Sequence, residues 1–133
     1  DANSTMDKFI TTRSEYNRGI EELGEMYRVG DQLRATQLTL EHIKALNQDF
    51  KDIRIEFAYI IPPKRFEDFH ILMSSAMQDI EGATNAQVTY YSTNLNTGVR
   101  DKFLADRSAA LLKSANLDST KASYMWAELT GQK

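Results

Sequence analysis

The sequence predicts an all-α fold, an antiparallel helical bundle of about four helices, and three observations support this. Apolar residues recur every three to four positions along most of the chain, which is the spacing of a helix face. Six Gly and two Pro in 133 residues are about half of the roughly 12% that average usage would give, which disfavours a turn-rich sandwich or barrel. These few residues also fall where the helical spacing breaks. We therefore expect residues 1–133 to form a single helical-bundle domain.

The first helix is expected over about residues 4–29. Its apolar face follows alternating steps of three and four, as in a heptad seam, through Met6, Phe9, Arg13, Tyr16, Ile20, Leu23 and Tyr27. Gly30 and then Asp31 are typical of a helix end followed by a new N-cap. The next face is shifted by one residue, which favours a turn, although one long helix through a stammer is the alternative.

The second helix is expected from about 32 towards 59, and its end is ambiguous. Its face contains Leu33, Thr36, Leu40, Ile43, Leu46, Phe50 and Ile53. Residues 53–61 also alternate apolar and polar side chains, and residues 88–91 are β-prone, so these two segments are either helix or strand. Helix is favoured because neither segment is separated by Gly or Pro from the helical pattern beside it.

Pro62 and Pro63 are the strongest helix break in the chain, because neither residue can donate to a preceding turn. A third helix is expected from about Lys64 to the Asn94–Gly98 segment. A fourth follows from Val99 to about Leu117, with Phe103 among its apolar residues. Asp118 or Ser119 is expected to cap a last segment that contains Tyr124, Met125 and Trp126.

Composition excludes several classes of function. The net charge of −3 has the wrong sign for a phosphate-binding surface, so no nucleic-acid partner is expected. No window has the length and apolarity of a membrane span. The absence of Cys removes thiol catalysis and thiolate metal sites but does not choose a compartment. The first residue is Asp rather than Met, which is typical of a processed chain, and a signal or lipid-anchor segment is the usual part removed.

No catalytic, cofactor-binding or metal-binding residues are predicted, and we expect the protein not to be an enzyme. The serines lie in helical patterns rather than nucleophile elbows, and no Gly-rich phosphate loop occurs. Glu67 and His70 form one Glu-x-x-His pattern of the kind that di-metal bundles use twice, but Thr39 stands where the second glutamate would be needed before His42. Glu67 also suits the first turn of a helix, where its charge favours the helix dipole.

Interaction or ligand contacts are expected instead at His70, Glu67, Tyr124 and Trp126. The apolar cluster at Tyr124 to Trp126 either docks on the bundle or presents an anchor to a partner. The aromatic residues form either ordinary core or the lining of a cavity between helices. The residues concerned are Tyr16, Tyr27, Phe50, Phe57, Tyr59, Phe66, Phe69, Tyr90 and Tyr91.

The segment from Ile61 through Pro62 and Pro63 to His70, with Met73, Ala76, Met77 and Ile80 after it, resembles a pattern in helical extracytoplasmic lipoproteins of Gram-positive bacteria. The likeness covers about residues 40–95. It implies a lipid-anchored cysteine upstream of Asp1 and a location outside the membrane, but it assigns no functional residue.

The expected function is therefore a non-enzymatic extracytoplasmic interaction or binding module, the soluble part of a cell-envelope lipoprotein. Its partner would be another protein at the envelope, and only an anchor outside this sequence would attach it to the membrane. One alternative is a helical carrier of a small apolar or metal-containing ligand near His70. Another is an intracellular or phage-encoded accessory regulator in the cytoplasm. The sequence leaves the oligomeric state open.

Overall fold

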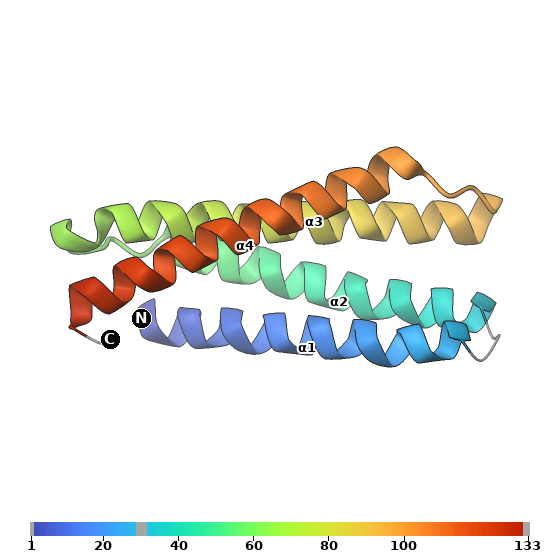
Figure 1. Cartoon of the computed structure of the whole chain (residues 1–133), viewed down its shortest axis with the longest axis horizontal. Helices are drawn as coiled ribbons and strands as arrows, with labels where there is room; N and C mark the ends of the chain where they lie inside the picture. Colours follow the sequence, from blue (N-terminus) through green and yellow to red (C-terminus); the bar gives the residue numbers. More distant parts are fainter. Residues whose placement is uncertain (1, 29–31, 132–133) are drawn as a thin grey trace.

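The computed structural model describes residues 2–28 and 32–131, with the side chains of residues 3–24 and 32–131. Four helices run alternately up and down, as Figure 1 shows: α1 (Ala2–Arg28), α2 (Gln32–Ala58), α3 (Glu67–Thr97) and α4 (Lys102–Thr130). A short 3-10 helix, η1 (Lys64–Phe66), precedes α3. No strand occurs in the ranges just given. The predicted all-α antiparallel bundle is confirmed.

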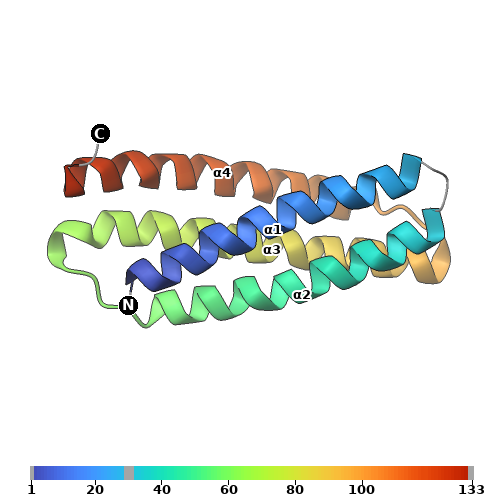
Figure 2. The same ribbon diagram turned by 90° about the horizontal axis from the view of Figure 1, so that it is seen from below.

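The structure decides between the alternatives for the chain's course. α1 and α2 lie side by side in both views of the ribbon (Figures 1 and 2), so they are two antiparallel helices and not one continuous helix. The predicted turn at Gly30 and Asp31 lies outside the described residues. Residues 53–58 and 88–91 are helical, so the strand alternative for both segments is wrong. α2 ends at Ala58, just before the segment that contains the two prolines.

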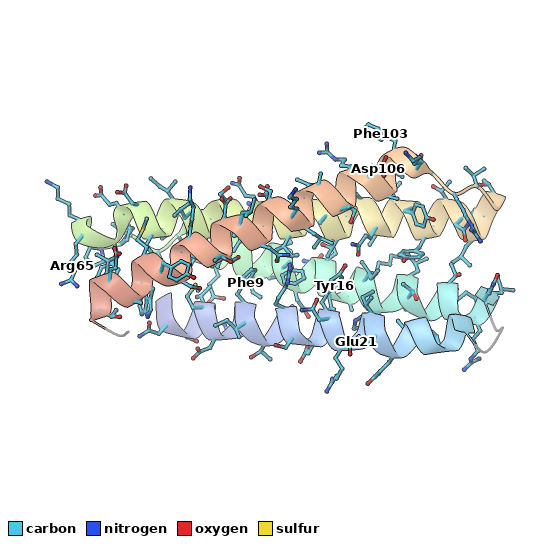
Figure 3. All side chains as sticks on the ribbon, in the orientation of Figure 1. Phe9, Tyr16, Glu21, Arg65, Phe103 and Asp106 are labelled. Atoms are coloured by element: carbon cyan, nitrogen blue, oxygen red, sulfur yellow. The ribbon has the colours of Figure 1, made fainter. Side chains whose placement is uncertain are left out.

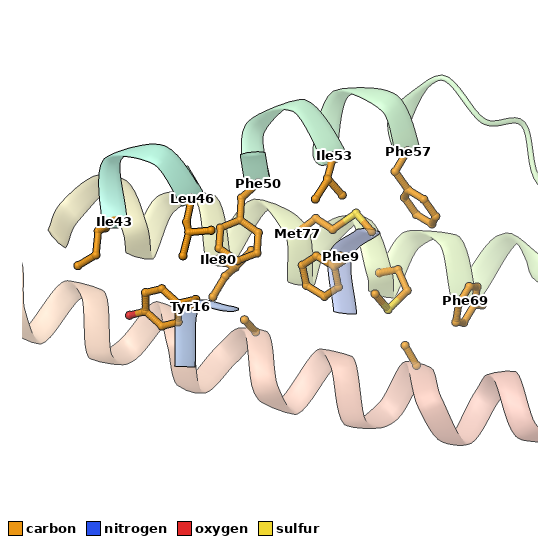
Figure 4. Close-up of a cluster of buried hydrophobic side chains, with 13 residues drawn as sticks. Phe9, Tyr16, Ile43, Leu46, Phe50, Ile53, Phe57, Phe69, Met77 and Ile80 are labelled. Atoms are coloured by element: carbon orange, nitrogen blue, oxygen red, sulfur yellow. The ribbon is translucent and has the colours of Figure 1, made fainter. Parts of the chain in front are cut away.

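Large apolar side chains from α2 and α3 fill the centre of the bundle (Figure 4). The predicted face of α2 supplies four of them, Ile43, Leu46, Phe50 and Ile53, and Phe57 continues the same spacing one turn further; all five are almost fully buried. α1 adds Phe9, whose ring meets that of Phe50 edge-on at 6.0 Å, and Tyr16. Leu33 was expected on the same face but is 65% exposed, although Ala35 and Thr36 in the same part of α2 are buried.

α4 differs from its prediction in two ways. It is one continuous helix, so the predicted break at Leu117 and the new cap at Asp118 or Ser119 are wrong. Its buried residues are Ser108, Ala115 and Ala122, which are small and seven residues apart, while Phe103 is 72% exposed. Small side chains at a helix contact allow a short interaxial distance, so α4 packs closely along α3 through this stripe.

Polar side chains fix α4 on α3 along its length. Ser75 donates a hydrogen bond to Asp118 at 2.9 Å, and Ser114 donates one to Asp79 at 2.7 Å. Nearer the other end, the Tyr16 hydroxyl donates to Gln87 at 2.8 Å, and the Gln87 amide donates to Ser108 at 2.7 Å, which links α1, α3 and α4. Burial raises the pKa of Tyr16, so its hydroxyl stays protonated and donates.

α1 packs closely on α2 at Gly19. A Cβ at this position would overlap the imidazole of His42, so only glycine permits the observed packing. The Nε2 atom of His42 is buried in this contact and has no hydrogen-bond partner among the described residues. At the start of α1, Lys8 pairs with Glu56 at 3.1 Å, and Thr5 also donates to Glu56. α1 is therefore held on α2 at its start and in its middle.

We predict that Asp49→Asn stabilises the protein at neutral pH. Burial, and then the charges of Asp52 and Glu15, raise the pKa of Asp49, so its ionised form is disfavoured in the folded state. Because Asp49 is exposed and solvent screens its charge, the amide should raise the free energy of unfolding by at most about 0.5 kcal/mol, the upper size of a like-charge helix pair. Because a raised carboxyl pKa costs stability only where the group ionises, the gain should vanish below about pH 3.9. Urea unfolding of both proteins at pH 7 and pH 3 measures it, and an equal gain at the two pH values would contradict this origin.

Candidate functional site

Four aromatic rings meet at the end of the bundle where the α2–α3 connection lies: those of Phe57, Phe66, Phe69 and Trp126. Pro62 and Pro63 keep the chain extended after α2, and the N–H of Phe66 then donates to the Pro63 carbonyl at 2.8 Å to close η1. α3 begins directly afterwards, so Phe66 and Phe69 face the end of α2. The C-terminal half of α4 returns to the same end, where it brings Trp126 (Figure 1).

His70 is held against the last turn of α2. Its ring stacks on that of Phe57 with 4.3 Å between centroids, and its Nε2 lies 3.0 Å from the Phe57 carbonyl oxygen. Because a carbonyl only accepts, Nε2 carries the proton and donates. This hydrogen bond fixes the orientation of the ring against α2.

Trp126 closes the opposite side of the site. Its ring lies 5.1 Å from that of Phe69 and 5.7 Å from that of Phe66, both in tilted contacts. It is half-buried and packs against the main core together with Met125 and Leu129. Arg65 adds a cation–π contact with Phe66 at 5.0 Å and donates to the Leu129 carbonyl, which ties η1 to the end of α4.

These side chains line an open-sided pocket of about 160 Å³, which we call the aromatic pocket. None of the described residues exposes a polar atom to it. Its lining consists of Phe57, Ile60, Pro62, Pro63, Phe66, Phe69, His70 and Trp126. A volume of this size accommodates one benzene ring. The arrangement therefore suits one uncharged, ring-sized group and offers no hydrogen bond to a polar one.

Two of the four residues expected to make contacts meet in the aromatic pocket, and two do not. His70 and Trp126 form its walls. Glu67 lies exposed in the first turn of α3, where its carboxylate favours the helix dipole. Tyr124 is 72% exposed and points away from the core, so of the apolar cluster it is Met125 and Trp126 that pack on the bundle.

Two larger pockets lie between α1 and α4. One, of about 440 Å³, shares Phe69 and Trp126 with the aromatic pocket and is partly lined by Asn3, Asp7 and Ser123. The other, of about 320 Å³, lies where Tyr16, Gln87 and Leu104 meet. The hydrogen bond from Arg13 to Asn116, at 2.6 Å, crosses from α1 to α4. Polar groups line part of both pockets. They are therefore less selective for an uncharged apolar group than the aromatic pocket is.

The described residues contain no cluster of three or more His, Asp or Glu side chains that would hold a metal ion. At His70 the donor Nε2 is already bonded to the Phe57 carbonyl. Within residues 2–28 and 32–131, no helix is both long and apolar enough to cross a membrane.

Comparisons of the chain with protein-family models, with curated proteins and with solved structures find no match.

The sequence indicates the aromatic residues as a group, but it does not indicate which of them meet in one pocket. Pro62 and Pro63 were interpreted only as a helix break, and Ile60 only as an apolar residue near the end of the second helix, yet all three line the aromatic pocket. The signal that could have found them is the density of apolar residues from Phe57 to Phe69, which is unusual for a connection between two helices.

Proposed function

We propose that this protein is a non-enzymatic binding module that holds one uncharged, ring-sized apolar group in the aromatic pocket. The observation that carries the proposal is the convergence of Phe57, Phe66, Phe69 and Trp126 around a space with no polar lining from the described residues. Aromatic walls of this kind supply large contact area at low conformational cost, which is why such pockets serve as anchor sites at interfaces.

The class of group follows from the lining. A charged or strongly polar group would lose its hydration in the pocket and gain no hydrogen bond, which costs several kcal/mol. A phenyl ring or a branched aliphatic side chain matches both the volume and the surface. The expected partner, an envelope protein, would supply such a group as a side chain, whereas the carrier alternative would supply it as a free molecule.

We also propose that the protein works outside the membrane as the soluble part of a cell-envelope lipoprotein. The support is the resemblance of residues 40–95 to such proteins. The start of α1 lies at the end of the bundle where α2 ends and α3 begins (Figure 1). This end holds the aromatic pocket, so an anchor upstream of Asp1 would hold the pocket towards the membrane. The gene sequence upstream of Asp1 tests this proposal. A signal segment with a lipobox cysteine is expected there, and a start codon with no signal segment before Asp1 would contradict the proposal.

We predict that toluene binds the aromatic pocket and changes the fluorescence of Trp126. The chain has one Trp, so the whole indole signal reports on this site. The change should saturate with toluene, while benzoate, the charged ring of similar size, should give none. Titration with N-acetylphenylalanine amide separates a partner's side chain from a free molecule as the source of the bound group. Binding of this probe would show that a side chain on a peptide backbone fits the pocket.

Two adjacent variants provide a matched control for this titration. Ile60→Phe places a ring in the pocket and should abolish the toluene response, because Ile60 lines it. Ile61→Phe makes the same change one residue later, at a side chain that is 92% exposed, and should leave the response intact. Equal responses from the two variants, or no saturable response in the unmodified protein, would contradict the proposed function.

A further inference from the structure

The outer face of α4 carries a regular apolar stripe that no other helix of the described chain covers. Phe103, Leu117 and Tyr124 are 72%, 61% and 72% exposed, and Ala110 between them is also exposed. These four residues are spaced at intervals of seven, and we call them the outer stripe. Figure 3 shows Phe103 projecting away from the bundle at the start of α4. The buried small residues of α4 have the same spacing but face α3.

We propose that the outer stripe pairs with the same stripe of a second copy of this chain in an antiparallel, twofold-symmetric dimer. A strict seven-residue repeat stays in contact with a partner helix when the two helices cross with a left-handed supercoil. The stripe runs from Phe103 to Tyr124, about 32 Å at 1.5 Å per residue. A twofold interface uses one patch twice, so this single stripe provides both sides of it.

Shape complementarity selects the register. In an antiparallel pair, Leu117 of one copy can lie over Ala110 of the other, so that a large side chain fills the space above a small one. The same register sets Phe103 opposite Tyr124, which gives an aromatic pair at each end of the interface. The two copies contribute identical contacts on either side of the twofold axis.

Charge complementarity supports the same register. Asp106 lies four residues before Ala110, and Lys121 lies four residues after Leu117, so Asp106 of each copy faces Lys121 of the other. Both side chains are exposed, and Asp106 has only a weak contact with Lys102 at 3.4 Å. Lys113 of each copy lies nearest the axis. Its long stem can cover apolar surface while the two ammonium groups turn to solvent.

Light scattering of the full chain after gel filtration tests the dimer. We expect a mass that rises with concentration from 15.2 kDa towards twice that value. Leu117→Glu should keep the single-chain mass at every concentration. Leu33→Glu is the matched control, because Leu33 is 65% exposed but lies on α2, and it should dimerise like the unmodified chain. A single-chain mass at all concentrations, or equal loss in both variants, would overturn the proposal.

Single-cysteine variants and a charge exchange test the direction and the register. The chain has no Cys, so Lys113→Cys is the sole thiol, and a short thiol cross-linker should join the two copies at the axis. Phe103→Cys should not cross-link, because its two copies lie at opposite ends of an antiparallel pair; efficient cross-linking there would overturn the antiparallel arrangement. Asp106→Lys should weaken the dimer, and adding Lys121→Asp should restore it. Failure of this restoration would overturn the register.

Discussion

Ile43→Ala should lower the free energy of unfolding by about 2–5 kcal/mol, a large part of the stability of a domain of this size. Ile43 lies on the buried face of α2 and is fully buried, near Leu46 and Ile80 in the core (Figure 4). The substitution removes three carbon atoms that the surrounding helices cannot replace without moving. The loss therefore includes both the transfer of these atoms to water and the cavity that they leave. Urea unfolding followed by circular dichroism measures it.

Ile71→Ala is the matched control, because it removes the same three atoms from a residue within a helix. Ile71 is 64% exposed on α3, so its change should stay within about 0.5 kcal/mol. Similar losses for the two variants would mean that the core does not lie between the faces described above.

Gly19→Ala should destabilise the protein by about 1–3 kcal/mol, although alanine is the better helix former. The added methyl group would overlap the His42 imidazole, so either this ring or α1 must move. Gly24→Ala tests the same change in the same helix, at a site where no side chain of the described residues lies within 4 Å of the new Cβ, and it should stabilise by about 0.5–1 kcal/mol. Both sites gain the same helix propensity from alanine, so the difference in sign follows from the close packing at Gly19.

A double variant isolates the contact between α1 and α2. His42→Ala removes the ring that the new methyl group meets, so Gly19→Ala should be much less harmful in that background. Thermal unfolding of the four proteins gives the coupling energy. Two results would show that α1 does not pack on α2 at Gly19. One is that Gly19→Ala stabilises as much as Gly24→Ala does, and the other is that Gly19→Ala and His42→Ala act additively.

The regular spacing of large apolar residues is why the fold and the α2 core were predictable. Ile43, Phe50 and Phe57 each lie on the expected face and are buried, because burial of large side chains dominates the choice of face. The same reasoning failed for α4. Its buried face consists of Ser108, Ala115 and Ala122, whose low hydrophobicity gives almost no signal in the sequence, while the larger Phe103 faces solvent.

The candidate site was predictable only in part, because it depends on which segments meet. His70 and Trp126 lie on different helices, and nothing local indicates that α4 returns to the end of α2. The sequence equally could not distinguish Trp126, which packs against Phe66 and Phe69, from Tyr124 two residues earlier, which is exposed. A continuous α4 decides this, since the direction of each side chain follows from the helix that carries it.

The most direct test of the proposed function is the position of bound toluene, measured by nuclear Overhauser effects between its protons and those of the protein. We expect cross-peaks to the indole of Trp126, the ring of Phe69 and the side chain of Ile60, all of which line the aromatic pocket. Cross-peaks to Tyr16 and Leu104 instead would place the ligand in the pocket of about 320 Å³ between α1 and α4 and would contradict the proposed function.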